Sequence, residues 1–213
     1  VMSFKVPTHY IDEEYGLEHQ MLFQTPLFTA SLQEFDNRKL EKDIYKLKEI
    51  DSGVSRSNRN GYHSESYEIV RDFSKIHGTE GDIFHPFVEN LETVISKLPF
   101  TPQITKIKTV NIWANISPKG ALNSEHNHPC CDLAGVYYVK IPEGDCGLLN
   151  LFDPREALVF GNQFITQTYT GGESTIRYPI EGQMWLFPSA LKHSVGTNNT
   201  EEDRISISFN LSF

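Results

Sequence analysis

The pattern of hydrophobic and polar residues changes once along the chain. Two early segments, residues 32–50 and 83–98, place apolar side chains three or four positions apart, which is typical of helices. Pro86 falls in the first turn of the second segment, where a helix tolerates proline. The polar, glycine-containing residues 51–64 between them predict a loop. We therefore expect two helices in the first part of the chain.

From residue 104 onward, nearly every segment has the pattern of a β-strand. These segments are residues 104–116, 133–141, 147–152, 173–180, 183–187 and 204–213. Short strands after packing helices predict a mainly β fold, a double-stranded β-helix (a cupin-like jelly roll) with the N-terminal helices packed on one sheet. Since the sequence contains no repeat or linker, we expect a single domain over residues 1–213, with helical support mainly in 1–100 and the β core mainly in 101–213.

Three histidines stand out as candidate metal ligands. His126 and His128 lie two positions apart, so an extended chain would point both imidazoles the same way, and His193 follows a buried strand that ends at a proline. Three protein ligands with open positions are typical of a catalytic metal site. Asp132 is an alternative, carboxylate ligand, which could reach the metal only if the segment after His128 turned back.

The last segment shows the most regular alternation in the chain. Its polar face begins with Arg204 and Ser206, and its other face is apolar. This pattern fits an ordinary sheet with one solvent-facing side. It also fits a strand whose polar face lines a cavity, where Arg204 offers a planar fork to a carboxylate and Ser206 adds a hydroxyl donor. Downstream of a candidate metal ligand, the pair is a candidate clamp for a dicarboxylate.

Four segments together resemble a known family. They are Asn123–Pro129, Gly135–Val139, Gly182–Ser189 with His193–Val195, and Arg204–Asn210. The chain resembles the iron(II)- and 2-oxoglutarate-dependent oxygenases, and within them a bacterial and phage branch related to the prolyl hydroxylases. The resemblance covers about the last half of the chain.

The resemblance implies an activity and the residues that carry it. Fe(II) would be held by His126, His128 and His193, and the far carboxylate of 2-oxoglutarate by Arg204, Ser206 and Tyr138. The activity implied is a dioxygenase that uses dioxygen to hydroxylate a substrate, with release of succinate and CO2.

One position departs from most of the superfamily. Most of its members carry Asp or Glu where this chain has His128, whereas the bacterial and phage branch that the chain resembles commonly has His. Three neutral imidazoles leave a metal more electrophilic and also suit zinc, copper or nickel.

Other interpretations of the same residues remain open. A three-histidine, cupin-like metalloenzyme would need no 2-oxoglutarate, and a non-catalytic jelly-roll module would only bind a ligand. Asn111, Trp113 and Asn115 alternate on one strand face and are either pocket residues or ordinary sheet surface. Cys130 and Cys131 follow the histidine pair, but their spacing matches no familiar mixed zinc site, and they are otherwise small packing residues.

Composition narrows the class of protein. A net charge of −9 argues against a protein that holds nucleic acid through its phosphates. Hydrophobic residues make up 38% of the chain, enough for a folded core. Three cysteines favour a reducing compartment, and no signal segment or membrane-spanning apolar run is visible. The sequence therefore predicts a cytoplasmic enzyme.

Overall fold

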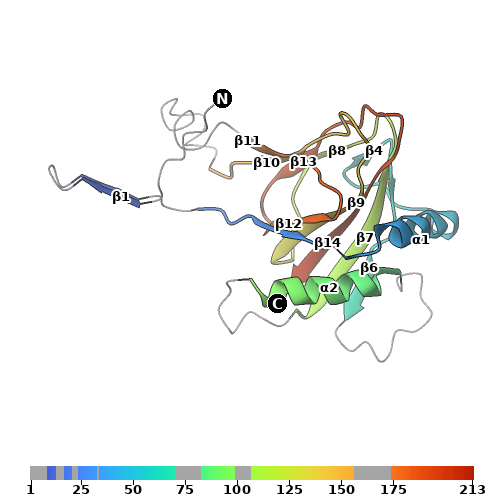
Figure 1. Ribbon diagram of the computed structural model, residues 1–213, viewed down its shortest axis with the longest axis horizontal. Coiled ribbons are helices and arrows are strands. Elements are labelled where there is room, and N and C mark those ends of the chain that lie inside the picture. Colours follow the sequence, from blue (N-terminus) through green and yellow to red (C-terminus); the bar gives the residue numbers. More distant parts are fainter. Residues whose placement is uncertain are drawn as a thin grey trace.

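The computed structural model describes residues 9–12, 17–20, 24–32, 34–70, 83–98, 107–155 and 174–213. Two antiparallel sheets dominate it (Figure 1). The larger contains β3 (Phe28–Ser31), β12 (Gln183–Pro188), β9 (Leu133–Lys140), β14 (Arg204–Ser212) and β7 (Thr109–Ser117) in that order, and both β5 (Tyr62–His63) and β6 (Tyr67–Val70) pair with β7. The smaller has the order β11 (Ser174–Arg177), β10 (Leu149–Phe152), β13 (His193–Val195), β8 (Leu122–His126), β4 (Asn58–Arg59). A separate hairpin joins β1 (His9–Asp12) to β2 (Leu17–Gln20).

Two helices cover one face of the larger sheet. Leu40, Ile44 and Leu47 of α1 (Asn37–Ile50) are buried in the same apolar cluster as Phe87 and Leu91 of α2 (His85–Ser96). The apolar face of β14 completes this cluster with Ile205, Ile207, Phe209 and Leu211, each of which is 0% exposed. Burial of one such side chain contributes about 1.5–3 kcal/mol. The predicted double-stranded β-helix with helices packed on one sheet is therefore confirmed.

A second, smaller apolar cluster lies between the two sheets. Its buried members are Leu149 and Leu151 of β10, Ala134 of β9, Phe187 of β12, and Leu191. This cluster joins the sheets at one side of the jelly roll and leaves the polar positions of the same strands to face a cavity. None of the helices within the described ranges is long and apolar enough to span a membrane.

Several element boundaries differ from the prediction. The first helix begins at Asn37 rather than at residue 32, because the Asp36 side chain caps it by accepting a hydrogen bond from the Lys39 amide at 2.9 Å. Leu32 instead donates to the carbonyl of Gly182 beside β12. The segment 51–64, expected to be a loop, contributes the short strands β4 and β5. Residues 104–106 and 173, the first residues of two expected strands, lie outside the described residues.

Two strands near the histidines were not predicted. β8 and β13 carry few apolar residues, because their side chains face a polar cavity rather than the core. The expectation that His126 and His128 share one extended strand was also wrong. β8 ends at His126, and the His128 amide donates to the carbonyl of Ser189 outside that strand.

Candidate active site

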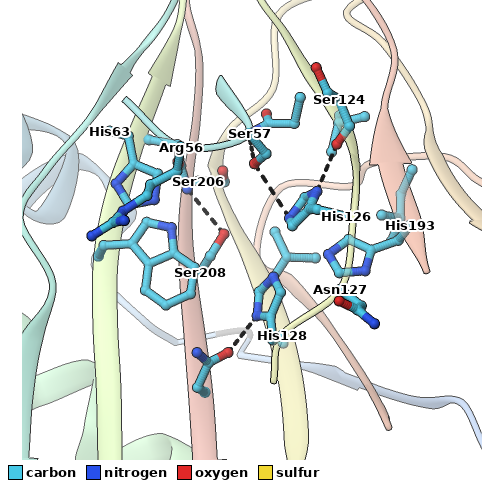
Figure 2. A pocket seen from close by; sticks show the side chains of 18 of the residues that line it. Arg56, Ser57, His63, Ser124, His126, Asn127, His128, His193, Ser206 and Ser208 are labelled. Carbon is cyan, nitrogen blue, oxygen red and sulfur yellow. Dashed lines mark hydrogen bonds between the residues drawn. The ribbon is translucent and has the colours of Figure 1, made fainter. Parts of the chain in front are cut away.

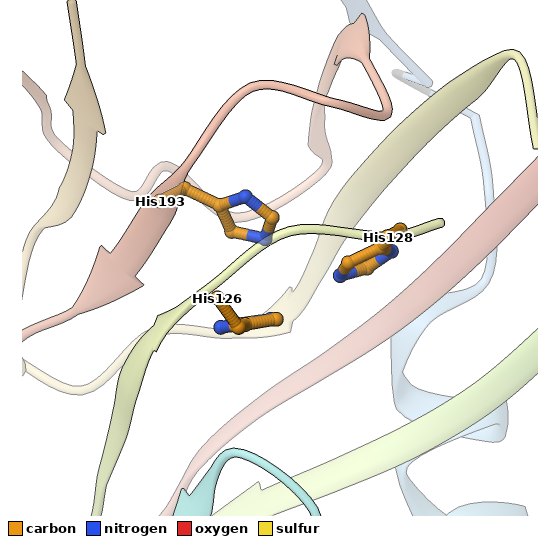
Figure 3. Close-up of side chains that lie close together, drawn as sticks. All are labelled: His126, His128 and His193. Atoms are coloured by element: carbon orange, nitrogen blue, oxygen red, sulfur yellow. The ribbon is translucent and has the colours of Figure 1, made fainter. Parts of the chain in front are cut away.

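The three candidate histidines converge, although only two of them lie on strands (Figure 3). His126 ends β8 and pairs in register with His193, the first residue of β13. His128 follows β8 after one residue. One nitrogen from each ring lies within 4.8 Å of the others, and the ring centroids are 4.3–5.1 Å apart. A small rearrangement of the rings would bring all three nitrogens onto a single ion.

Each of the three imidazoles is held at its Nδ1 atom. His126 Nδ1 lies 2.7 Å from the carbonyl of Ser124, and His193 Nδ1 lies 2.9 Å from that of Leu191. His128 Nδ1 lies 2.5 Å from the side-chain oxygen of Asn210. Because these oxygens can only accept, each Nδ1 carries the proton and donates. The Nε2 lone pairs are thereby left to accept, an arrangement typical of metal-binding histidines, and that of His126 faces Ser57 Oγ at 3.4 Å.

Burial keeps these histidines neutral. It lowers the pKa of His126 and of His128, and it lowers that of His193, which is 5% exposed, to about 3. The neighbouring imidazoles of the cluster add to the effect on His193. A neutral imidazole is the form that binds a metal, so the site is ready for an ion at neutral pH.

The alternative ligands lie elsewhere. The Asp132 carboxylate accepts a hydrogen bond from the Phe213 amide at 2.9 Å, at the far end of β14, and it does not join the cluster. Cys130 and Cys131 do not join it either; Cys130 is exposed, and the Cys131 thiol contacts the carbonyl of His128 at 3.5 Å. The segment after His128 thus does not turn its carboxylate back toward the imidazoles.

The histidines open into a cavity of about 650 Å³ between the two sheets (Figure 2). The polar face of β14 lines it with Arg204, Ser206, Ser208 and Asn210. Of the two interpretations of the alternating strand, the geometry therefore matches the one in which the polar side faces a cavity. Solvent exposure and a polar cavity produce the same alternation, and only the tertiary structure separates them.

Arg204 is a buried cation at the inner part of this cavity. It is 3% exposed, and its Nη1 atom donates to the carbonyl of Cys146 at 2.5 Å, while Nη2 donates to Ser117 Oγ at 3.3 Å. Burial lowers its pKa. No carboxylate in the described part of the chain lies within 4.0 Å of its guanidinium, so its charge has no ionic partner there.

Tyr138 and Ser206 share the cavity with Arg204. Tyr138 on β9 is 2% exposed, and its neighbour in the sheet is Ser206 on β14, which is 8% exposed. Burial raises the pKa of Tyr138, and the positive charge of Arg204 acts in the opposite direction. The three residues therefore place a guanidinium and two hydroxyls in a nearly dry part of the cavity.

Gly147 allows the backbone to approach Arg204. Its φ is +87°, and a Cβ atom there would lie 2.1 Å from the carbonyl oxygen of Gly196 and 2.7 Å from Arg204 Nη1. A side chain at this position would displace the carbonyls that hold the guanidinium.

Two of the three expected pocket residues on β7 line the cavity. Trp113 and Asn115 do so, and Asn115 donates to Ser208 Oγ at 3.0 Å. Asn111 does not line it, because it lies beyond Trp113 on the part of β7 that pairs with Glu68 of β6.

Several residues that line the cavity or support its histidines were not selected from the sequence. His63 is 7% exposed and stacks on Trp113 at 5.3 Å with an interplanar angle of 8°. Ser57 Oγ lies 3.4 Å from His126 Nε2, and Arg56 lies beside His63 (Figure 2). Asn210, which anchors His128, was visible only as one polar position of an alternating strand. No local signal distinguishes these residues, because a polar loop between helices has the same composition as ordinary surface.

Known proteins share both the sequence pattern and the fold. Residues 111–210 match the family described as "Putative 2OG-Fe(II) oxygenase". No curated protein matches the sequence. A prolyl 4-hydroxylase of Pseudomonas putida is similar in structure at 13% identity with a TM-score of 0.58, over 88% of this chain and 92% of that one.

Two further solved structures extend the likeness. A prolyl hydroxylase of Trichoplax adhaerens, in complex with a peptide fragment of a hypoxia-inducible factor, has 12% identity and a TM-score of 0.59, over 87% of this chain and 83% of that one. HygX of Streptomyces hygroscopicus, with nickel, 2-oxoglutarate and hygromycin B bound, has 12% identity and a TM-score of 0.54, over 88% and 83%. At this identity the structures establish the shared fold. The matched residues 111–210 contain the histidine cluster and the arginine strand, so this part of the chain matches the model of the 2OG-Fe(II) oxygenase family.

Proposed function

We propose that the protein is an Fe(II)- and 2-oxoglutarate-dependent dioxygenase that hydroxylates a C–H bond of its substrate. The observation that carries the proposal is one cavity that holds both a cluster of three anchored imidazoles and a buried arginine without an ionic partner among the described residues. A metal site alone would fit many enzymes. The buried arginine in the same cavity favours an anionic cosubstrate.

The donor set fits iron. His126, His128 and His193 would supply three Nε2 ligands from one side, which leaves positions open for cosubstrate and dioxygen. Imidazole ligands also suit nickel, copper and zinc, so the residues allow several metals and the family assignment selects iron. With no carboxylate in the cluster, the ligands bring no negative charge, so an anionic cosubstrate would supply the first negative charge at the ion.

The far carboxylate of 2-oxoglutarate would lie against Arg204. A guanidinium with free donors matches a carboxylate through two parallel hydrogen bonds, and Ser206 and Tyr138 each add a hydroxyl donor. The buried position strengthens this interaction because water does not screen it. A ligand carboxylate would also provide the counter-charge that the described residues do not.

Bound Fe(II), with 2-oxoglutarate and dioxygen, supplies the oxidation: one oxygen atom enters a substrate C–H bond to give C–OH, and the other enters succinate as CO2 is released. The residues of the chain bind, orient and exclude water. Asn210 and the carbonyls of Ser124 and Leu191 fix the imidazoles, and the apolar residues Leu149 and Phe187 limit water on the cavity wall.

The test is turnover of the cosubstrate. Purified protein with Fe(II), 2-oxoglutarate and dioxygen should form succinate even without its substrate, at the slow rate of uncoupled turnover, and 2-oxoglutarate with Fe(II) should raise the melting temperature. His193→Ala should lose both the bound iron and the succinate. Iron binding without any effect of 2-oxoglutarate would favour a three-histidine metalloenzyme of another kind, and stabilisation by 2-oxoglutarate without succinate would favour a binding module.

A further inference from the structure

The cavity carries more positive charge than the proposed cosubstrate requires. The chain has a net charge of −9, yet the charged residues among the described lining are Arg56, Arg59 and Arg204 against Glu125. 2-Oxoglutarate has two negative charges, and Fe(II) with Arg204 already supplies three positive ones. Arg56 and Arg59 are therefore left without a role in balancing the cosubstrate.

Glu125 does not neutralise these arginines, because its carboxylate faces Lys192 at 3.6 Å. Within the described ranges, no carboxylate lies within 4.0 Å of the Arg56 guanidinium. The positive charge of Arg56 instead acts on the imidazole of His63, whose pKa is lowered mainly by burial and further by this arginine. A cation at a cavity mouth, without a partner in its surroundings, attracts anions to that mouth.

The two cations act at different places in the cavity. Arg204 is buried and begins β14 in the larger sheet. Arg56 is exposed and precedes β4 at the edge of the smaller sheet. An anion bound by Arg204 therefore leaves the side of Arg56 open to a second ligand.

The segment that presents Arg56 is held in place by its own hydrogen bonds. The Arg56 amide donates to Asn58 Oδ1 at 2.7 Å, and Asn58 Nδ2 donates to the carbonyl of Gly61 at 2.9 Å. Arg59 Nη1 donates to the carbonyls of Arg56 and Asn58, both at 2.9 Å. The cation is thus presented by an ordered turn, which lowers the entropy cost of ligand binding.

A continuous wall connects this turn with the metal ligands. Ser57, the neighbour of Arg56, contacts His126, and Trp113 stacks on His63 at 5.3 Å and lies 5.7 Å from the ring of His128. A molecule anchored at Arg56 would therefore lie along Trp113 with its other end directed to the histidine cluster.

We infer that the substrate of this dioxygenase is a small anionic molecule whose carboxylate or phosphate group is bound by Arg56, with Arg59 adding charge, while its oxidised C–H bond faces the histidines. The inference rests on the proposed function, because it takes the second ligand of the cavity to be the hydroxylated substrate. Arg56 is here a specificity-determining residue, and a neutral analogue of the substrate should be rejected.

The experiment uses matched pairs of acids and neutral compounds. The full chain is loaded with Fe(II) and 2-oxoglutarate without oxygen and dialysed against two sets of pairs. In the first set each amino acid is paired with its amide, and in the second each nucleoside 5′-monophosphate is paired with its nucleoside. Bound compounds are quantified by mass spectrometry. At least one acid should bind about ten-fold or more tightly than its neutral partner, and Arg56→Gln should abolish that preference. A preference for the acid in the first set indicates that the bound group is a carboxylate, and a preference in the second set indicates a phosphate.

A matched control is Lys119→Gln, because Lys119 is an exposed cation that pairs with Glu201 and does not line the cavity. It removes the same charge and should keep the acid preference. Binding of no acid, equal binding of acids and neutral partners, or a preference that survives Arg56→Gln would each overturn the inference. An equal loss of 2-oxoglutarate affinity in Arg56→Gln would assign this arginine to the cosubstrate and would also overturn it. Succinate formed without added substrate reports on the proposed function separately, so the two failures are distinguishable.

Discussion

Removal of the Arg204 guanidinium should weaken 2-oxoglutarate binding by roughly two orders of magnitude. Charge-assisted bonds of a guanidinium with a carboxylate are roughly twice as strong as neutral ones. At a site 3% exposed, truncation of one partner of a charge pair costs about 3 kcal/mol, and about 1.4 kcal/mol corresponds to a factor of ten in the dissociation constant. Arg204→Ala should therefore raise the dissociation constant about 100-fold.

The same substitution also has a structural cost, which must be separated from the binding effect. Arg204 donates to the carbonyl of Cys146 and to Ser117 Oγ, and its loss leaves these acceptors unpaired. Each such loss costs about 1–3 kcal/mol of stability. Tyr138→Phe removes a single hydroxyl and keeps the guanidinium, so it should weaken cosubstrate binding by a smaller factor in a protein that folds normally.

The assay is calorimetric titration of 2-oxoglutarate into Fe(II)-loaded protein without oxygen, after the iron content and the melting temperature of each variant are measured. Iron should stay bound in Arg204→Ala, because no metal ligand is changed. Arg204→Lys should restore binding only in part, since an ammonium group cannot form the two parallel hydrogen bonds. Unchanged 2-oxoglutarate affinity in a folded alanine variant would make Arg204 a purely structural residue and refute the reasoning.

Three further outcomes test the metal site. His128→Ala should abolish iron binding by elemental analysis while Asp132→Ala retains it, and the opposite result would place the carboxylate on the metal. Asn210→Ala should weaken metal binding about 10–100-fold in a competition titration, because it frees the His128 ring, and an unchanged affinity would deny Asn210 this orienting role. Burial lowers the pKa of His193 to about 3, so below about pH 6.5 the unfolded chain binds more protons than the folded protein. The melting temperature of the metal-free protein should therefore fall as the pH is lowered. In His193→Gln this fall should be less steep.

The sequence predicted the strands that pack on the helices better than the strands that line the cavity. β14 and β9 bury apolar side chains against α1 and α2, so their patterns are strong. β8 and β13 were missed because both faces of these short strands carry polar residues, and the cavity that explains those residues exists only after the sheets have folded together. The spacing of apolar residues along a sequence predicts a strand only where that strand buries apolar side chains.

The residues of the candidate site likewise divide into those that could be selected from the sequence and those that could not. His126, His128, His193 and Arg204 could be selected because their spacing or residue type is unusual for a surface. Arg56 and His63 could not, since a polar segment before a short strand looks like any loop. Their position depends on pairing between β4 and β8 and between β5 and β7, contacts that join parts of the chain about sixty residues apart.

The two sheets that line the cavity differ in how heavily they are packed. The larger sheet is buttressed by both helices, and the four residues of β14 that face them are fully buried, so the strand that carries Arg204 and Ser206 is fixed from behind. β4, which carries Arg59 and follows Arg56, is a two-residue strand at the edge of the smaller sheet, with one neighbour. Elements with few packed neighbours open at a lower cost in free energy than core strands. The proposed cosubstrate clamp therefore lies on the more heavily packed sheet, and the proposed substrate anchor lies beside an edge strand whose order depends on the hydrogen bonds of its own turn.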